Sequence, residues 1–462
     1  MLSKKKDIEI LEESEAHTQT YSSRYFNEGV PKYTLPKESM PANAAYQLIH
    51  DELNLDANPA LNLASFVTTW MEPEAIQLIH ESLHKNYIDH DEYPQTEVIQ
   101  TRCVNMLANL YNAPKGGRSM GTATIGSSEA IMLGLLGHKW VWKKRREAEG
   151  KPYDRPNVIF GAHAHICWDK FAKYFDVEMR AVPVEKDCFV LNVEKVERLI
   201  DENTIAVGAI LGSTYTGEID PISALNTLLL KIKKTRGWDI PLHVDGASGG
   251  FVFPFTQPKT VWDFRLEQVK SINVSGHKFG LVYPGVGWIL WREEADFPEE
   301  LIYKVDYLGD WMPTYTLNFS RGSSTMIGQY YNFLRLGHEG YTAIMKNCLA
   351  NASYLAGKLE KTGLFELVNR GDSLPIVVVK LSPEADGYTV FDLSEKLREK
   401  GWIVPAYTLP PNAEEVSVLR VVARENFSED MANLLAQHIT EACQFLSKKT
   451  FAEPKKHALA IC

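Results

Sequence analysis

The stretch SINVSGHKFG, residues 271–280, starts like a β-strand and ends by presenting a histidine and a lysine. Apolar residues alternate with small or polar ones over 271–275, which is typical of a strand. Two glycines then bracket His277 and Lys278, where an ordinary turn carries Asn, Asp or Ser. A lysine at a strand end is most often a solvated terminus, so a chemical role for Lys278 requires partners elsewhere in the chain.

The sequence around this stretch alternates between short apolar runs and amphipathic stretches. The runs suit strands buried on both faces, and they span residues 156–160, 204–211, 241–245, 271–276 and 287–291. The amphipathic stretches suit helices, and they span residues 127–148, 192–201 and 221–235. This alternation predicts an α/β fold with a mainly parallel central sheet and helices on both faces. Ligands of such sheets lie beyond the carboxyl ends of the strands, so the residues that follow each strand are candidate site residues.

The length of 462 residues predicts more than one domain. We expect an N-terminal arm over 1–60 with a short helix at 44–55, and a large domain over 61–345. A smaller C-terminal α/β domain is expected over 346–447, followed by a flexible tail over 448–462. The expected strands of the small domain are 375–381 and 417–423, and its expected helices are 389–400 and 429–447.

Composition excludes several classes of function. The net charge of −10 argues against a general nucleic-acid surface, which needs a basic face. No apolar run reaches membrane-spanning length, and the N-terminal stretch lacks the apolar core of a signal peptide. The six cysteines are scattered without paired spacing, which suits a reducing compartment and supplies no metal framework. We therefore expect a cytoplasmic enzyme without a metal.

Asp245 supplies the partner that Lys278 requires. It ends the predicted strand 241–245 and is followed by small residues, so a flat molecule could approach it closely. Both side chains then lie at the same edge of the sheet. This pair suits pyridoxal phosphate (PLP): the lysine would hold the aldehyde as a Schiff base, and the aspartate would hold a proton on the pyridine nitrogen.

Two further segments complete a cofactor site. Ser127 and Ser128 follow a glycine at the start of a predicted helix, where backbone N–H groups and the helix dipole favour a phosphate, although Ser and Glu there are also ordinary capping residues. His165 follows the strand 156–160 and could stack on the ring of the cofactor. His163 lies nearby, and the two histidines could share or exchange that role.

Five segments resemble the glutamate decarboxylases, the bacterial and plant-type branch of the group II PLP-dependent decarboxylases, whose fold is that of the type I PLP-dependent transferases. The segments are SGHKFGLVYPGVGWILWR (275–292), HVDGASGGFVFPF (243–255), TYTGEIDPI (214–222), TIGSSEA (124–130) and NFSRGSSTMIGQYYNFLRLGHEGY (318–341). The resemblance extends from about residue 31 to 447.

The resemblance implies a role for each matching cofactor residue. Lys278 would be the Schiff-base lysine, Asp245 the pyridine partner, and Ala247 would pack on the ring. The phosphate would be bound by Ser127, Ser128 and His277, and by Ser320 of a neighbouring subunit. His165 would stack on the ring, and Thr214 would lie near the cofactor hydroxyl and the substrate carboxylate. Tyr307 would return a proton to Cα, with an ordinary packed tyrosine as the alternative.

The resemblance also implies a substrate site. Ser65 and Phe66 end a segment that receives the side-chain carboxylate, Asn86 and Asp89 match positions contributed across a dimer, and Arg420 matches an arginine near the bound carboxylates. Two positions depart from the best-known bacterial members, which carry glutamine at the position of His165 and threonine at the position of Ser65. Both replacements keep hydrogen-bonding capacity.

The implied reaction is the α-decarboxylation of L-glutamate to 4-aminobutanoate and CO₂, which consumes one proton per turnover. Aspartate, cysteine sulfinate or an aromatic amino acid as substrate, an aldehyde lyase reaction, and a catalytically dead homologue kept as an assembly partner are the alternatives. We expect a homodimer with shared active sites or a higher oligomer such as a hexamer. His457 could plug the site at neutral pH, against the alternative of an unordered tail, and no calmodulin binding is expected because the tail lacks a tryptophan-bearing basic helix.

Overall fold

The structure is a computed structural model that describes residues 32–114, 120–305 and 312–448. The chain divides into two units, Met1–Pro59 and Ala60–Cys462. In the first unit, helix α1 spans Ala42–Leu53 and buries Ala44 and Leu48. The helix begins directly after Pro41, which cannot continue a helix toward its N-terminus, and it covers most of the predicted range 44–55.

The second unit contains a large sheet of seven strands in the order β1-β7-β6-β5-β4-β2-β3. The strands are β1 (Met120–Thr124), β2 (Asn157–Gly161), β3 (Glu178–Val182), β4 (Thr204–Ile210), β5 (Leu242–Asp245), β6 (Val269–Ser275) and β7 (Gly287–Trp291). Only β7 runs antiparallel to its neighbours, so the predicted α/β fold with a mainly parallel sheet is confirmed. Each predicted strand is present to within two residues.

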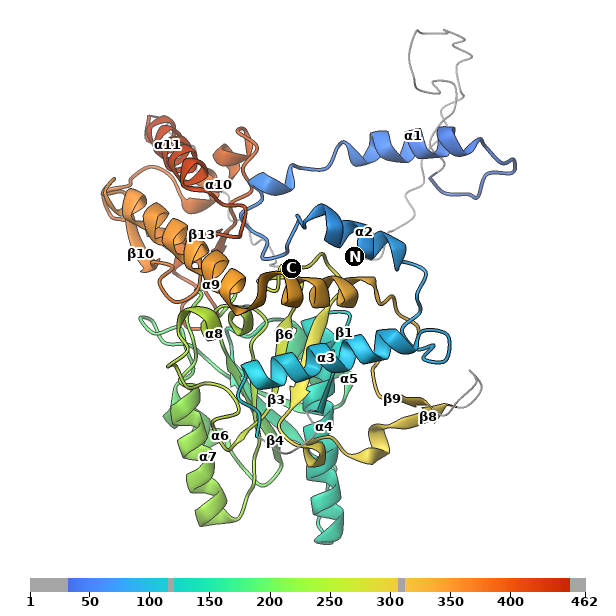
Figure 1. Cartoon of the computed structure of the whole chain (residues 1–462). Helices are drawn as coiled ribbons and strands as arrows, with labels where there is room; N and C mark the ends of the chain where they lie inside the picture. The colour runs from blue at the N-terminus through green and yellow to red at the C-terminus, as the bar shows by residue number, and fades with distance from the viewer. Residues whose placement is uncertain (1–31, 115–119, 306–311, 449–462) are drawn as a thin grey trace. The chain divides into compact units, whose positions relative to one another are not determined.

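Helices cover both faces of the large sheet. One face packs against α3 (Pro94–Leu110), α6 (Val193–Leu199) and α7 (Ile222–Arg236), and Figure 1 shows α3 crossing in front of the strands. The other face packs against α4 (Ser127–Ala148) and α5 (Cys167–Tyr174). Because strand side chains alternate, Trp288 of β7 is buried in the core on the face covered by α3, α6 and α7, while Trp291 packs in a smaller cluster with Ala130 and Leu133 of α4 on the opposite face.

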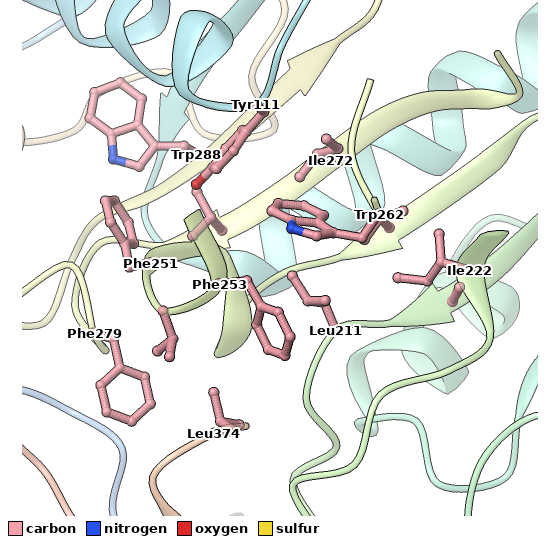
Figure 2. Close-up of a cluster of buried hydrophobic side chains, with 14 of the residues drawn as sticks. Tyr111, Leu211, Ile222, Phe251, Phe253, Trp262, Ile272, Phe279, Trp288 and Leu374 are labelled. Carbon is pink, nitrogen blue, oxygen red and sulfur yellow. The ribbon is translucent and has the colours of Figure 1, made fainter. Parts of the chain in front are cut away.

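The core on the face covered by α3, α6 and α7 anchors the turns that carry the candidate site residues. Phe279, directly after Lys278, is buried in this core together with Phe251 and Leu211, which follow β5 and β4. Figure 2 shows these side chains gathered with the rings of Tyr111 and Trp288. Since each anchor lies within four residues of a candidate residue, burial of the apolar side chains helps to fix the position of the strand ends.

A smaller antiparallel sheet follows in the order β10-β11-β13-β12. Its strands are β10 (Phe365–Asn369), β11 (Ile376–Leu381), β12 (Ala406–Thr408) and β13 (Ser417–Val422). Helices α10 (Val390–Arg398) and α11 (Glu429–Leu446) pack on it together with the second half of α9 (Ser324–Glu360). The predicted boundary at residue 345 falls inside α9, whose backbone departs from helical geometry at Gly337 (φ 54°), and the division into domains stays a prediction.

The remaining elements are short. They are α2 (Pro73–Glu81), α8 (Phe253–Thr256), a two-stranded sheet of β8 (Tyr303–Val305) and β9 (Met312–Thr314), and single 3-10 turns at Pro59–Leu61, Gly249–Phe251, Glu294–Asp296 and Glu299–Leu301. Among the helices that the structure describes, none combines the length and the apolar character needed to span a bilayer.

Candidate active site

A cavity of about 360 Å³ lies where the ends of four strands meet the N-terminus of α4. Eight of the predicted site residues line it: Ser127, Ser128, His165, Thr214, Asp245, Ala247, His277 and Lys278. Ser127 and Ser128 begin α4, and the other six lie at or after the ends of β2, β4, β5 and β6, which is the edge where an α/β sheet binds its ligands. The structure therefore brings together side chains that are up to 151 residues apart (278 − 127).

Asp245 is held in the floor of the cavity by three N–H donors. Its Oδ2 accepts from Trp168 Nε1 at 3.1 Å, and its Oδ1 accepts from Asn273 Nδ2 at 2.9 Å and from the Ala247 backbone N–H at 3.1 Å. The residue is 5% exposed. A buried carboxylate with three such donors is fixed in orientation.

Lys278 follows β6 by three residues, and its ammonium lies in the cavity near Ser248 Oγ (3.4 Å) and above the ring of Phe66 (5.1 Å). Burial lowers the pKa of Lys278, and the nearby carboxylate of Asp245 only partly opposes that effect. A larger fraction of the amine is therefore neutral, the form that attacks an aldehyde.

Two glycines shape the turn that presents Lys278. A Cβ at Gly280 would lie 2.5 Å from the carbonyl oxygen of Gly276 and 2.8 Å from the ring of Phe251. A Cβ at Gly276 would collide with the side chains of Gln329 and Val286. Both positions therefore require glycine because neighbouring atoms occupy the space of any side chain.

The N-terminus of α4 opens into the same cavity. Ser127 Oγ lies 2.7 Å from Ser275 Oγ, and a Cβ on Gly126 would lie 3.2 Å from the ring of His277. Glu129 in the first helical turn uses its carboxylate elsewhere, because it accepts from the backbone N–H groups of Ile125 (2.9 Å) and Leu317 (3.0 Å). The helix end thus keeps its N–H groups for an anion.

The two histidines after β2 have different surroundings. His163 is buried, and its Nε2 lies 3.1 Å from Asp220 Oδ1; burial lowers its pKa, but this carboxylate outweighs burial, so the pKa of His163 is raised. His165 is partly buried, and burial together with the charge of Lys278 lowers its pKa. His165 Nδ1 accepts from the Cys167 backbone N–H at 3.3 Å, which places the ring proton on Nε2.

Cys167 also lines the cavity but is chemically inert. Burial raises the pKa of its thiol to about 12. The thiol is therefore protonated at neutral pH and is a poor nucleophile. Among the described residues, no group of three or more His, Cys, Asp or Glu side chains could hold a metal ion.

Comparison with known proteins identifies the family. Residues 36–382 match the pyridoxal-dependent decarboxylase conserved domain. The chain belongs to the pyridoxal-dependent decarboxylases. It is 52% identical to glutamate decarboxylase from Solanum lycopersicum, over 97% of this chain and 89% of that protein. It is 47% identical to glutamate decarboxylase from Lactococcus lactis subsp. lactis, over 95% of both chains.

A solved structure of a decarboxylase gives the same result for the fold. Glutamate decarboxylase from Lactobacillus brevis superimposes with a TM-score of 0.89 at 43% identity, covering 92% of this chain and 97% of that one. The resemblance inferred from the sequence motifs is thus confirmed, as is the type I fold of this decarboxylase family.

Independently of these comparisons, the polar groups that line the cavity of this decarboxylase fit pyridoxal phosphate. The Nδ1 atoms of His163 and His277 are buried, line the cavity and have no hydrogen-bond partner among the described residues. A buried ring nitrogen without a partner is costly, and a polar ligand removes that cost. Burial and the charge of Lys278 lower the pKa of His277 to about 4, so its imidazole is neutral at pH 7.

Six predicted residues lie in the described part of this decarboxylase but not among the cavity-lining residues: Ser65, Phe66, Asn86, Asp89, Ser320 and Arg420. Ser65 Oγ accepts from the Val67 N–H at 3.1 Å, and Phe66 lies beneath Lys278. Ser320 is exposed, and Asn86 accepts from the Arg321 N–H at 3.3 Å. Tyr307 and His457 lie outside the described residues.

Arg420 occupies a different environment from the expected carboxylate clamp. Its Nη1 donates to the carbonyl of Thr214, and its Nη2 donates to the carbonyl of Ala64 at 2.7 Å. Its guanidinium lies over the ring of Phe66 at 5.0 Å. In this conformation Arg420 joins the segment around Phe66 to the loop after β4, and a direct contact with a substrate carboxylate stays a prediction.

Sequence reasoning missed Trp168 and Asn273, the two side chains that hold Asp245. Asn273 carried a signal, because Ser271, Asn273 and Ser275 form a polar row at period two in a strand buried on both faces. Buried polar side chains require partners, so this row pointed to a hydrogen-bonded network. Trp168 carried none, because an indole N–H finds its acceptor only in the folded chain.

Proposed function

We propose that this chain, with pyridoxal phosphate, catalyses the α-decarboxylation of L-glutamate to 4-aminobutanoate and CO₂. The main structural support for this proposal is the cavity that is lined by Lys278, Asp245 and the start of α4. Relatives that are 52% and 47% identical over nearly the whole chain bear the name glutamate decarboxylase, which supports the choice of substrate. The reaction exchanges the Cα–carboxylate bond for a Cα–H bond and takes up one proton.

Lys278 and Asp245 serve the two ends of the cofactor ring. When bound, pyridoxal phosphate supplies an electron sink for the pair of electrons left at Cα. Lys278, whose pKa is lowered by burial, supplies the neutral amine that holds the aldehyde. Asp245, fixed by three N–H donors, holds a proton at the ring nitrogen.

The phosphate would bind at the start of α4. Ser127 and Ser128 supply hydroxyl groups and the helix N-terminus supplies backbone N–H groups. The unpartnered Nδ1 of His277 is available as a further contact. His165 lines the same cavity from the segment after β2, and it would stack on the ring with its proton on Nε2.

The substrate groups would be oriented by residues around the cavity mouth. We place the side-chain carboxylate near Ser65 and Phe66, with Arg420 fastening this segment through Ala64. Thr214 lines the cavity and would face the α-carboxylate and the cofactor hydroxyl. Tyr307, outside the described residues, stays the proposed donor of the proton to Cα.

We propose a homodimer or a higher oligomer, in which Asn86, Asp89 and Ser320 serve the site of the neighbouring subunit. Their positions outside the cavity of their own chain support this assignment, and Ser320 is exposed. We propose a cytoplasmic location, supported by five free cysteines among the described residues. Calmodulin and nucleic acid are not proposed as partners.

The substrate is tested by measuring CO₂ release from L-glutamate, L-aspartate, cysteine sulfinate and an aromatic amino acid, with and without added pyridoxal phosphate, from acid to neutral pH. Release from glutamate alone supports the proposal, and a preference for another amino acid overturns the substrate. Lys278→Ala should remove the visible absorbance of the bound cofactor and lower kcat by at least about 1,000-fold, because the covalent anchor is lost. A colourless unsubstituted protein would point to the dead homologue.

A further inference from the structure

Behind Asp245 runs a continuous row of buried hydrogen bonds. His138 Nε2 lies 2.7 Å from Ser271 Oγ, and the same hydroxyl lies 2.6 Å from His243 Nδ1. His243 Nε2 lies 2.8 Å from Asn273 Oδ1, and Asn273 Nδ2 donates to Asp245 Oδ1 at 2.9 Å. The row thus leads from α4 through β6 and β5 to the cavity floor, and we refer to it as the Asp245 relay.

The register of the sheet builds this relay. Strands β5 and β6 pair in parallel, with His243 opposite Ser271 and Asp245 opposite Asn273. Residues two apart on a strand point to the same face, so all four side chains face α4. Helix α4 closes over them, because a Cβ on Gly134 would lie 2.8 Å from the ring of His243. No member of the relay is more than 5% exposed.

The carboxylate determines the direction of every bond in the relay. Ionised Asp245 only accepts, so the amide group of Asn273 turns its Nδ2 toward Asp245 and its Oδ1 toward His243. His243 must then carry its proton on Nε2, which leaves Nδ1 to accept from the hydroxyl of Ser271. The oxygen of Ser271 in turn accepts from Nε2 of His138. One orientation of four groups satisfies all of them.

Both histidines of the relay are neutral. Burial lowers the pKa of His243 to about 4, although Asp245 partly opposes this, and burial also lowers the pKa of His138. A neutral His243 has one donor and one acceptor, so its hydrogen-bond pattern depends on which nitrogen carries the proton. When the oxygen of Ser271 accepts from His138, its hydroxyl donates to Nδ1 of His243, which satisfies only the tautomer that carries its proton on Nε2. Trp168 packs edge-on against the same ring at 5.5 Å between centroids.

We propose that His243 is a positioning residue for the cofactor, which keeps Asn273 turned so that its N–H donates to Asp245, and that Ser271 and His138 hold His243 in the required tautomer. Without Ser271, either tautomer of His243 leaves one atom unsatisfied, and the alternative tautomer would turn the carbonyl oxygen of Asn273 toward the carboxylate. The carboxylate of Asp245 would then be less well oriented, and its interaction with the ring nitrogen of the cofactor would be weaker.

The test uses two substitutions of His243 that differ in reach. Glutamine places an amide N–H near the position of Nε2, so His243→Gln keeps the donor toward Asn273. Asparagine places its amide near Nδ1, so His243→Asn keeps a contact with Ser271 but loses the donor. Ser271→Ala removes the hydroxyl from the relay. Ser82→Ala is the matched control, because Ser82 is equally buried and donates to Leu78 O at 2.6 Å, away from the cavity.

The measurements are made on the full-length protein. Equilibrium dialysis gives the dissociation constant of pyridoxal phosphate, and visible circular dichroism reports the orientation of the bound ring. We expect about 10-fold weaker binding and an altered dichroic band for Ser271→Ala and His243→Asn, since a hydrogen bond to a charged group is lost or disordered. His243→Gln and Ser82→Ala should both bind within about 3-fold of the unsubstituted protein.

Equal dissociation constants and equal dichroism for Ser271→Ala and Ser82→Ala would overturn the proposal, and so would equal effects of the Gln and Asn variants. If His243→Asn does not fold, Ser271→Ala decides alone. The inference rests on the cofactor part of the proposed function and not on glutamate. If the chain does not use pyridoxal phosphate, the unsubstituted protein will not bind the cofactor. If only the proposal about the relay is wrong, the unsubstituted protein will bind the cofactor, and the variants will show the same dissociation constant and dichroism as their controls.

Discussion

Thr68 fixes the reactive lysine from outside the cavity. Its backbone N–H donates to the carbonyl of His277 at 2.9 Å, and its hydroxyl donates to the carbonyl of Lys278 at 2.8 Å. Thr68 is fully buried, and the carbonyl of Lys278 also accepts from the Leu281 backbone N–H at 3.1 Å. The backbone of the His-Lys pair is therefore set before a ligand arrives, which lowers the cost of orienting the amine.

Thr68→Val tests this role, because valine has nearly the same shape but no hydroxyl. The carbonyl of Lys278 would keep the Leu281 N–H as a donor at 3.1 Å but lose the Thr68 hydroxyl, which should lower the free energy of unfolding by about 0.5–1.5 kcal/mol. Urea unfolding measures this loss, and cofactor binding should weaken in parallel. Thr68→Ser keeps the hydroxyl and is the control; if serine and valine are equally destabilising, the hydrogen bond is not the cause.

At the scale of the element, the turn after β6 depends on two glycines for steric reasons. Gly280 meets the backbone of Gly276, and backbone atoms cannot move aside as a flexible side chain can. This turn connects β6 to β7, so a shift in it would disturb Lys278 and the antiparallel pairing of the two strands together.

Gly280→Ala should therefore cost about 3 kcal/mol in the free energy of unfolding, at the upper end of the usual cost of overpacking. Gly357→Ala in α9 is the matched control, since a Cβ there meets no atom within 4 Å. That control should stabilise the protein by about 0.5–1 kcal/mol, because alanine is the better helix former. Chemical denaturation of both variants would settle the matter: similar values would contradict the steric explanation.

Sequence periodicity predicted the buried strands well and the outer strands poorly. Strand β4 is buried throughout and was predicted to within one residue, whereas β1 (MGTAT) and β3 (EMRAV) at the sheet edges lack an apolar run and were not predicted. Residues placed directly after predicted strands do meet in the cavity. The partners of Arg420 could not be predicted, because they lie 206 and 356 residues away in the sequence.

At the scale of the whole molecule, buried histidines connect stability to pH. The pKa of His277 is about 4, lowered by burial and by the charge of Lys278, and the pKa of His243 is about 4, lowered by burial. In the unfolded chain each would return to about 6.5. The unfolded state therefore binds more protons between pH 4 and 6.5, and the free energy of unfolding falls as the pH falls through this window.

Replacing His277 by glutamine should flatten this dependence, since each histidine contributes at most about 3 kcal/mol. Asp296 acts in the opposite direction, because burial raises its pKa to about 6 and stabilises the protein toward acid. The contribution of His277 is therefore taken from the difference between the two proteins. The free energy of unfolding of the His277→Gln variant and of the unsubstituted protein is measured in urea at several pH values, without cofactor. Bound phosphate would favour protonated His277 and reduce the slope; parallel curves for both proteins would show that His277 does not titrate in this window.

Arg424 connects the end of the chain to the lysine turn. It follows β13, and its guanidinium donates to the carbonyls of Val67 and of Asn62, the latter at 3.2 Å, while the adjoining Thr68 holds Lys278. During ribosomal synthesis Lys278 is made about 150 residues before Arg424. When the lysine turn is first made, Arg424 does not yet hold the segment from Asn62 to Val67. The segment that holds the lysine turn therefore gains its last two hydrogen bonds only after residue 424 has been synthesised.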